Sequence, residues 1–201
     1  MNNQNSNPAL MSVMTNLSNG EVRGAPVVTS SKTVGDLASY WHDAPALASL
    51  DPAAPLYTTE SWLPAGEGKE GALAWGNTRL LAGRVGREYF MTRGHFHRKR
   101  EKGELVVCVS GEGALVLMSE GRETRVELLR PGSTHYVPGH TAHRTANTGG
   151  VPLVFLCAWA ADCGHDYDEV RERGFSRLLV EVEGAPQLVT PEEKRTSQKI
   201  S

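Results

Sequence analysis

The residues with the clearest chemical potential are histidines. Six of the seven histidines lie between residues 95 and 165, and His95 and His97 are separated by one residue in the sequence GHFH. In an extended strand, residues two apart point to the same face, so both imidazoles should lie side by side while Phe96 points the other way. Imidazole nitrogens are common ligands of divalent metal ions. The pair therefore predicts one side of a metal site.

Two further residues can complete this site. Glu104 opens the apolar run ELVVCVS after the charged turn RKREKG, and antiparallel pairing would bring its carboxylate beside the two histidines. His143, 48 residues after His95, begins a later strand that can pair back across a barrel. Three imidazoles and one carboxylate suit Fe, Mn, Ni, Zn or Co, and they leave coordination positions open for neighbouring oxygens of a hydroxy-carbonyl substrate. Separate surface or core histidines are the alternative, which an isolated H-x-H would favour.

The elements that must position these side chains are short runs between Leu56 and Trp159, each ended by Gly, Pro or Asn. Their length and spacing are typical of an antiparallel sandwich or barrel. SEGRE (119–123) predicts a hairpin turn, and RPGS (130–133) predicts a type II turn. The predicted strands are NTRLLAGRVG, EYFMTRGHFH, ELVVCVSG, GALVLMS, RETRVELL, THYVPGH, HRTANTG and PLVFLCAW.

Helices are expected only at the sides of the barrel. Residues 33–50 predict one short helix, or two broken at Pro45, as a lid or packing element. Residues 165–174 predict a helix closed by Gly174, followed by a strand in SRLLVEVEG.

Length and charge limit the remaining possibilities. A chain of 201 residues can form one domain, which we place at 31–189, between disordered tails at 1–30 and 190–201. A formal charge of −2 argues against nucleic-acid or anionic-membrane partners, and no apolar run is long enough to span a bilayer. The three cysteines imply no disulfide framework. We therefore expect a soluble cytoplasmic protein.

The same residues carry a family resemblance. H-x-H, then a glutamate, then Gly111 resembles the first motif of cupins, and Gly132 to Pro138 followed by His143 and Asn147 resembles the second, with His140 in place of one family glycine. The segments EYFMTRGHFH to HRTANTG, PLVFLCAWAADCGHDYDEV and RGFSRLLVE are similar, across about 56–183, to cupin-type phosphoglucose isomerases of archaea and some bacteria.

The motif spacing also bears on which glutamate is the ligand. In ordinary cupins the glutamate follows the second histidine after three or four residues, which would indicate Glu101. Only Glu104 has the six-residue spacing of the motif to Gly111. We therefore choose Glu104 and keep Glu101 as the alternative.

The resemblance implies an all-β cupin fold, a double-stranded β-helix or jelly-roll barrel with short flanking helices, in a homodimer. It implies an aldose-ketose isomerase of glycolysis and gluconeogenesis that interconverts glucose 6-phosphate and fructose 6-phosphate. His95, His97, Glu104 and His143 would hold one divalent transition metal per chain, with Fe²⁺ the first expectation and Mn²⁺, Zn²⁺, Ni²⁺ or Co²⁺ the alternatives. Glu104 would also be the base that moves a proton through a cis-enediol; in a metal-held hydride shift it would be a ligand only.

The resemblance further implies the residues that bind the phosphate. Thr92 and Gly94 would supply a hydroxyl and a backbone N–H, and Thr78 and His165 match two more family positions. For the two threonines, a role as ordinary strand residues is the alternative. His165 is expected at the start of a helix, where it could instead belong to the cap.

Two positions depart from the family. Val106 and Trp159 stand where the family has tyrosines, and the second of these tyrosines commonly reaches the phosphate. An indole N–H can still donate but from a different place, so substrate affinity and selectivity depend on these changes. A non-catalytic sugar-binding cupin therefore stays open, and so does an Fe- or Mn-dependent cupin dioxygenase, because three histidines and a glutamate resemble the ligands of those enzymes as well.

The remaining polar aromatic residues have weaker assignments. Tyr136 and Tyr167 are possible pocket residues, although Tyr136 could equally pack in a strand. His42, His135 and His140 match no ligand position and are expected at the surface or rim.

Overall fold

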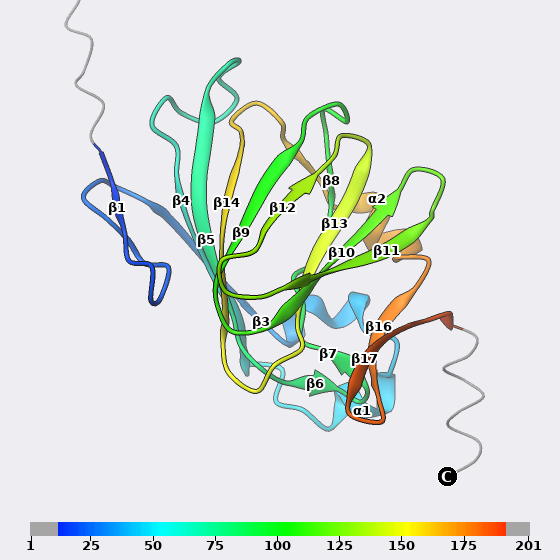
Figure 1. The fold of residues 1–201 in the computed structure, drawn as a ribbon. Helices are drawn as coiled ribbons and strands as arrows, with labels where there is room; N and C mark the ends of the chain where they lie inside the picture. The colour runs from blue at the N-terminus through cyan, green and yellow to red at the C-terminus, as the bar shows by residue number, and fades with distance from the viewer. Residues whose placement is uncertain (1–11, 192–201) are drawn as a thin grey trace, which may run out of the picture.

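Two antiparallel sheets form the body of the protein in the computed structural model, which describes residues 12–191 (Figure 1). One sheet has six strands in the order β12-β9-β14-β5-β4-β3, and the other has three in the order β11-β10-β13. The strands are β3 (Val28–Thr33), β4 (Pro55–Trp62), β5 (Leu73–Leu80), β9 (Glu104–Ser110), β10 (Gly113–Ser119), β11 (Thr124–Leu129), β12 (Thr134–Val137), β13 (Thr141–Asn147) and β14 (Leu153–Ala160). The predicted all-β fold with short flanking helices is confirmed.

The core lies between the sheets and continues outside the smaller one. Six consecutive residues of β10, Gly113 to Met118, are buried. Leu115 lines the interior of the barrel. On the opposite face, Val116 lies near residues 177–179, and Met118 Sδ accepts a hydrogen bond from Ser176 N at 3.3 Å. Because both faces of β10 are covered, its sequence is continuously apolar instead of alternating.

Small strand pairs fill the sides of the barrel. β6 (Arg84–Val85) and β7 (Glu88–Tyr89) join β16 (Leu178–Val182) and β17 (Ala185–Val189) in a four-stranded sheet. β8 (Phe96–His97) pairs with β15 (His165–Asp166). β3, β4 and β17 were not predicted; Val28 to Ser30 lie in the expected tail, and Pro55 and Pro186 obscure the strand pattern of the other two.

The N-terminal helical region contains two short helices. They are a 3₁₀ helix, η1 (Gly35–Tyr40), and α1 (Ala44–Ala48). The prediction of a break at Pro45 is wrong in position, because the break precedes this residue. Asp43 caps α1 by accepting a hydrogen bond from Ala46 N at 3.1 Å, and Pro45 lies in the first turn, where its missing N–H leaves no helical bond unmade.

The second predicted helix is shorter than expected. α2 spans Asp168–Arg173 and ends at Gly174, which has φ +62°, but His165 and Asp166 belong to β15. The predicted helix start at His165 is therefore wrong. His165 and Asp166 are extended because they pair with His97 and Phe96 of β8.

Residues 12–30 differ from the disordered tail that we expected. β1 (Met14–Thr15) and β2 (Val22–Arg23) form a hairpin that packs against the outside of the large sheet. Trp75 Nε1 donates to Thr15 Oγ1 at 3.1 Å, and Val22 N donates to Glu60 Oε2 at 3.1 Å. Hydrogen bonds to distant strands thus order a segment without apolar periodicity. The other tail residues, 1–11 and 192–201, lie outside the described residues.

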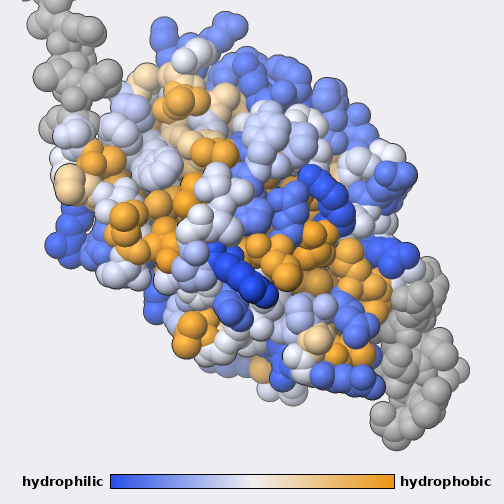
Figure 2. Space-filling model, in the orientation of Figure 1, coloured by the Kyte–Doolittle hydropathy of each residue, from blue (hydrophilic) through white to orange (hydrophobic). Residues whose placement is uncertain are grey.

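The surface shows no extended apolar layer on the side drawn in Figure 2, where apolar residues lie in several groups separated by polar ones. Within residues 12–191, no helix has the length and apolar character needed to cross a membrane.

Two glycines of the predicted motifs provide a test of the fold. Gly111 (φ +81°) and Gly132 (φ +86°) both have left-handed backbone, but a Cβ on Gly111 would lie 2.6 Å from Pro152 O, whereas one on Gly132 would meet nothing within 4 Å. We expect Gly132→Ala to destabilise the protein by about 1–2 kcal/mol through backbone strain alone. Gly111→Ala should lower the free energy of unfolding by about 1–3 kcal/mol more, because its Cβ would also clash with the Pro152 carbonyl. Denaturant unfolding measures both values, and equal losses would contradict the close approach.

Candidate metal centre and its cavity

Four side chains meet on the inner face of the barrel. His95, His97, Glu104 and His143 each offer one ligand atom, and these atoms all lie within 4.8 Å of one another. The structure therefore brings together all four predicted ligands. Glu101 is exposed and lies outside the cluster, so the alternative glutamate is excluded from this group of donors.

The backbone sets the positions of two of these histidines. His95 and His143 form an antiparallel bridge in which each backbone N–H donates to the carbonyl of the other, at 3.1 and 3.0 Å. Their ring centroids are 4.4 Å apart. His97 lies on the same side as His95, with ring centroids 5.6 Å apart, while Phe96 is fully buried elsewhere in the core. The same-face prediction is confirmed, although the expected long strand is interrupted between β7 and β8.

A nearby charged turn orients the imidazole of His97. Its Nδ1 donates to the carbonyl of Lys102 at 2.9 Å, so that Nε2 faces Glu104 Oε2 at 3.3 Å. The buried carboxylate of Asp162 holds this turn through the ammonium groups of Lys99 at 2.6 Å and Lys102 at 3.6 Å. Such outer contacts fix which imidazole nitrogen is free to act as a ligand.

The cluster has a strong electrostatic character. Burial would raise the pKa of Glu104, but the adjacent imidazoles of His143 and His97 hold this pKa well below its usual value. Burial also opposes a charge on His97, yet hydrogen bonds with Cys163, Glu104 and the Lys102 carbonyl raise its pKa to about 10. The pKa of His95 is well below its usual value, because of burial and the nearby imidazoles of His143 and His165. Glu104 is therefore ionised beside the imidazoles.

The donor set fits a divalent metal ion. The Nε2 atoms of His95 and His143 are buried without a hydrogen-bond partner, although His143 Nε2 lies 3.5 Å from Glu104 Oε2. Buried polar atoms are normally satisfied, so these two nitrogens indicate a ligand. Imidazole and carboxylate donors suit first-row divalent ions.

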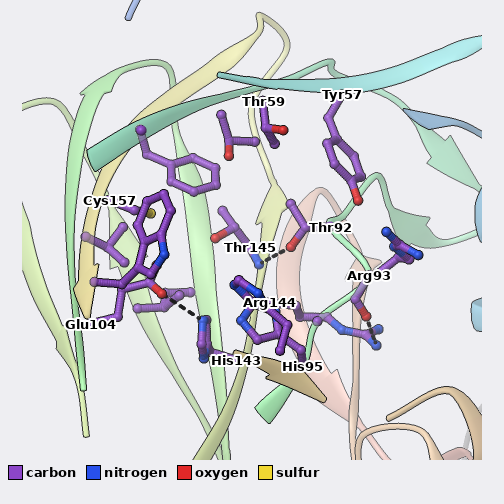
Figure 3. Close-up of a pocket in the computed structure, with 18 of the residues that line it drawn as sticks. Tyr57, Thr59, Thr92, Arg93, His95, Glu104, His143, Arg144, Thr145 and Cys157 are labelled. Atoms are coloured by element: carbon purple, nitrogen blue, oxygen red, sulfur yellow. Dashed lines mark hydrogen bonds and ion pairs between the residues drawn. The ribbon is translucent and has the colours of Figure 1, made fainter. Parts of the chain in front are cut away.

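The cluster forms part of the wall of a cavity of about 220 Å³ (Figure 3). Glu104 is the only carboxylate among the described residues that line it. Figure 3 shows Glu104 on one side of the cavity and Arg93 and Tyr57 on the other, with Thr92 and Thr145 between them. The cavity therefore has an acidic, histidine-rich side and a basic side.

All five predicted substrate-binding residues line this cavity; they are Thr78, Thr92, Gly94, Trp159 and His165. The Oγ1 atom of Thr92 accepts a hydrogen bond from Thr145 N at 3.1 Å. Trp159 pairs with Glu104 across β14 and β9, so it lies on the acidic side. The ring of His165 lies 4.6 Å from that of His95, and burial lowers its pKa, which makes the neutral imidazole the stable form near neutral pH.

The sequence interpretation missed several cavity residues. Tyr57, Arg93 and Thr145 also line the wall, and Thr145 could have been found because it lies two residues after His143 on one strand. Arg93 could not, because Thr92, Arg93 and Gly94 form an irregular segment in which all three line the cavity, without the alternation of a strand.

Of the two tyrosines predicted as possible pocket residues, only Tyr167 lines the cavity. Its ring stacks on His165 with an interplanar angle of 16°. Tyr136 is 62% exposed and is absent from the cavity wall, so its interpretation as a pocket residue is wrong. His135 and His140 pair with Glu127 and Glu120 at 2.9 and 3.1 Å, away from the cluster. The Nδ1 atom of His42 lies 3.4 Å from Glu88 Oε2.

Known proteins resemble this chain over most of its length. The family described as "Glucose-6-phosphate isomerase (GPI)" matches residues 31–194. The "Glucose-6-phosphate isomerase" of Pyrococcus horikoshii is 35% identical over 179 residues, which cover 89% of this chain and 94% of the relative. That of Thermococcus kodakarensis is 37% identical over 177 residues, covering 86% and 90%. Among solved structures, Bacillus subtilis oxalate decarboxylase aligns with a TM-score of 0.44 and 19% identity, covering 55% of this chain and 26% of the other.

The cluster predicts a specific metal-dependent stabilisation. At a free Mn²⁺ or Fe²⁺ concentration of about 100 times Kd, we expect the free energy of unfolding to rise by about 2.7 kcal/mol. His143→Ala should abolish this gain, whereas His140→Ala, which alters an exposed histidine outside the cluster, should keep it. Thermal unfolding with and without metal, together with metal content, measures the difference. Equal behaviour of the two variants would contradict a site at the cluster.

Proposed function

Because this chain belongs to the glucose-6-phosphate isomerase family, we propose that it interconverts glucose 6-phosphate and fructose 6-phosphate in the cavity beside Glu104. The observation that carries the proposal is the convergence of His95, His97, Glu104 and His143 on one point inside the region that the family matches. An all-β barrel alone would support many functions, so the site and the family membership are both needed.

Glu104 is suited to the proton transfer of this reaction. Moving a carbonyl between C1 and C2 requires a base that removes a proton from one carbon and returns it to the next through a cis-enediol. The lowered pKa of Glu104 keeps its carboxylate ionised, and no other described carboxylate lines the cavity. A direct hydride shift is the competing mechanism and would leave Glu104 as a ligand only.

We assign the metal-binding role to His95, His97, Glu104 and His143, with one divalent ion per chain and Fe²⁺ as the first candidate before Mn²⁺, Zn²⁺, Ni²⁺ and Co²⁺. The bound ion would supply Lewis-acid stabilisation for the oxygens of the enediol. The residues themselves fix the donor atoms: the Lys102 carbonyl orients His97, and the bridge to His143 holds His95.

Substrate contacts are assigned to the residues that line the same cavity. Thr78 and Thr92 offer hydroxyl groups, Gly94 offers a backbone N–H, and Trp159 and His165 offer ring N–H groups. Trp159 and the apolar Val106 line the wall in place of the family tyrosines, with Trp159 directly across from Glu104. We expect these two residues to change the affinity and selectivity for sugar phosphates relative to the family pattern.

The family membership favours an isomerase over the two other functions. A cupin dioxygenase could use the same four ligands, but the chain matches glucose-6-phosphate isomerases at 35–37% identity over most of its length. The same family match argues against a non-catalytic sugar-binding cupin. We further propose a single catalytic domain at residues 31–189 that acts as a cytoplasmic homodimer on a small sugar phosphate.

The central activity is directly measurable. Metal-loaded protein supplied with fructose 6-phosphate should form glucose 6-phosphate with a turnover of about 1–10³ s⁻¹, detected through glucose-6-phosphate dehydrogenase. EDTA should abolish the activity, and at least one of the five candidate metals should restore it. Failure of all five would overturn the isomerase proposal, while substrate-dependent oxygen uptake would identify a dioxygenase and binding without turnover a sugar-binding protein.

The role of Glu104 in catalysis can be tested against Glu101, which lies three residues earlier in the sequence. Glu104→Gln should lower kcat about 10²–10⁴-fold, because the amide is not a base. Glu101→Gln removes an exposed carboxylate outside the cluster and should leave kcat unchanged. Metal content must be measured in both variants, and the kcat comparison applies to protein with full metal occupancy. Near wild-type turnover of metal-replete Glu104→Gln would refute the base assignment.

Isotope exchange distinguishes the two mechanisms in the wild-type protein. Glucose 6-phosphate formed from fructose 6-phosphate in deuterated water should carry solvent deuterium at C2 if Glu104 exchanges its proton with water. Initial-rate product without deuterium would instead favour the hydride shift.

A further inference from the structure

The cavity contains a cation that the proposed phosphate contacts do not include. Arg93 lies between Thr92 and Gly94, and all three line the wall. In Figure 3, Arg93 lies with Tyr57 across the cavity from Glu104. In a hexose 6-phosphate, the phosphate at C6 is at the opposite end from the reacting C1 and C2. The basic side therefore has the right chemistry for the phosphate when the acidic side holds the reacting carbons.

The charge of Arg93 has no carboxylate partner. Within residues 12–191 we find no ion pair between Arg93 and an acidic side chain, and its Nε is buried without a hydrogen-bond partner. The electrostatic effect of Arg93 reaches the carboxylate of Asp36, which is fully exposed and accepts a hydrogen bond from Thr33 N at 2.9 Å instead. A partly buried cation without an anion is costly, so its place in a cavity wall favours an anionic ligand.

Aromatic residues hold the guanidinium in place. Its central carbon lies 4.5 Å from the centroid of the Tyr167 ring, within the range of a cation–π contact. The Tyr57 side chain is buried beside it, and contact with Arg93 offsets part of the rise in pKa that burial gives the Tyr57 hydroxyl. The backbone carbonyl of Arg93 also accepts a hydrogen bond from Arg144 Nη2 at 2.9 Å. Arg93 is therefore positioned before any ligand arrives.

From this placement we propose that Arg93 is a phosphate-binding residue of the cavity, with its guanidinium supplying the charged contact that Thr78, Thr92 and Gly94 cannot give. This inference rests on the proposed isomerase function for the identity of the substrate, but the phosphate contact itself does not depend on turnover. A guanidinium offers N–H donors in a planar fork that matches two phosphate oxygens. Such charge-assisted contacts are stronger than those of neutral donors.

A chain of net charge −2 needs a local cation to bind a dianionic sugar phosphate. The overall field gives no attraction, so the charge must be matched locally. His165 is a weaker candidate for this charge, because its ring lies on the histidine-rich side of the cavity, with its centroid 4.6 Å from that of the His95 ring. Arg144 is 6% exposed and its Nη1 and Nη2 atoms already donate to Met91 and the Arg93 carbonyl. Arg93 combines charge, access to the cavity and freedom from an acidic partner.

Three variants test the role of Arg93. Arg93→Met removes the charge at similar length, Arg93→Lys keeps the charge but loses the fork, and Arg125→Met is a matched control on β11, where Arg125 is exposed and pairs with Glu127. The first measurement is the dissociation constant of inorganic phosphate for EDTA-treated protein by titration calorimetry. The second is the pair kcat and KM for fructose 6-phosphate with full metal occupancy.

For Arg93→Met we expect phosphate binding to weaken and KM to rise, each by about 10–100-fold, with kcat changed less than about threefold. Arg93→Lys should fall between this variant and the wild type, and Arg125→Met should match the wild type. Melting temperature and metal content are measured in all of them. If Arg93→Met does not fold, the Arg93→Lys result decides, because loss of the fork alone must weaken phosphate binding by several-fold.

Two results would overturn the inference. One is unchanged phosphate affinity and KM in both Arg93 variants while the wild type is active, and the other is a fall in kcat with KM unchanged, which would make Arg93 a support for the catalytic side. A wild type that binds phosphate through Arg93 but does not isomerise fructose 6-phosphate would refute the proposed function and leave the phosphate contact standing. The two proposals therefore fail on different observations.

Discussion

One ionised carboxylate, enclosed by three imidazoles inside a barrel, is the constraint on which the rest of the structure depends. Burial disfavours the charge of Glu104, and the imidazoles of His97 and His143, at 3.3 and 3.5 Å, together with that of His95 offset this cost. Their separation in sequence means that β8, β9 and β13 must all be in register for the carboxylate to be tolerated. The same proximity that makes the charge acceptable creates the donor set for a divalent ion.

Periodicity predicted the parts of the site that lie on regular strands. The i and i+2 rule places His95 and His97 on one face, and motif spacing selects Glu104 over the exposed Glu101. The cavity residue Arg93 could not be predicted in this way, because its irregular segment has no period. The strand at His165 was also missed, since its pairing with His97 is a long-range contact that outweighs the helix signals after it.

The N-terminal segment illustrates the same limit on a larger scale. Residues 14–23 have the composition of a tail, yet hydrogen bonds to Trp75 and Glu60 make them a hairpin on the outer face of the sheet. In contrast, the apolar run of β10 was readable because it is buried on both faces. Local sequence thus predicts elements whose burial is large, and it fails where a few polar contacts with distant strands decide the conformation.

The paired backbone hydrogen bonds between His95 and His143 have a consequence for how the protein opens. Because the main chain joins these two residues directly, fraying of this edge of the barrel would separate both imidazoles at once. Loss of this backbone pairing would displace His95 and His143 together, so the two residues belong to one cooperative unit. A bound cation would then oppose separation of the His95 and His143 backbones. The rate of metal release would report how often this backbone pairing opens.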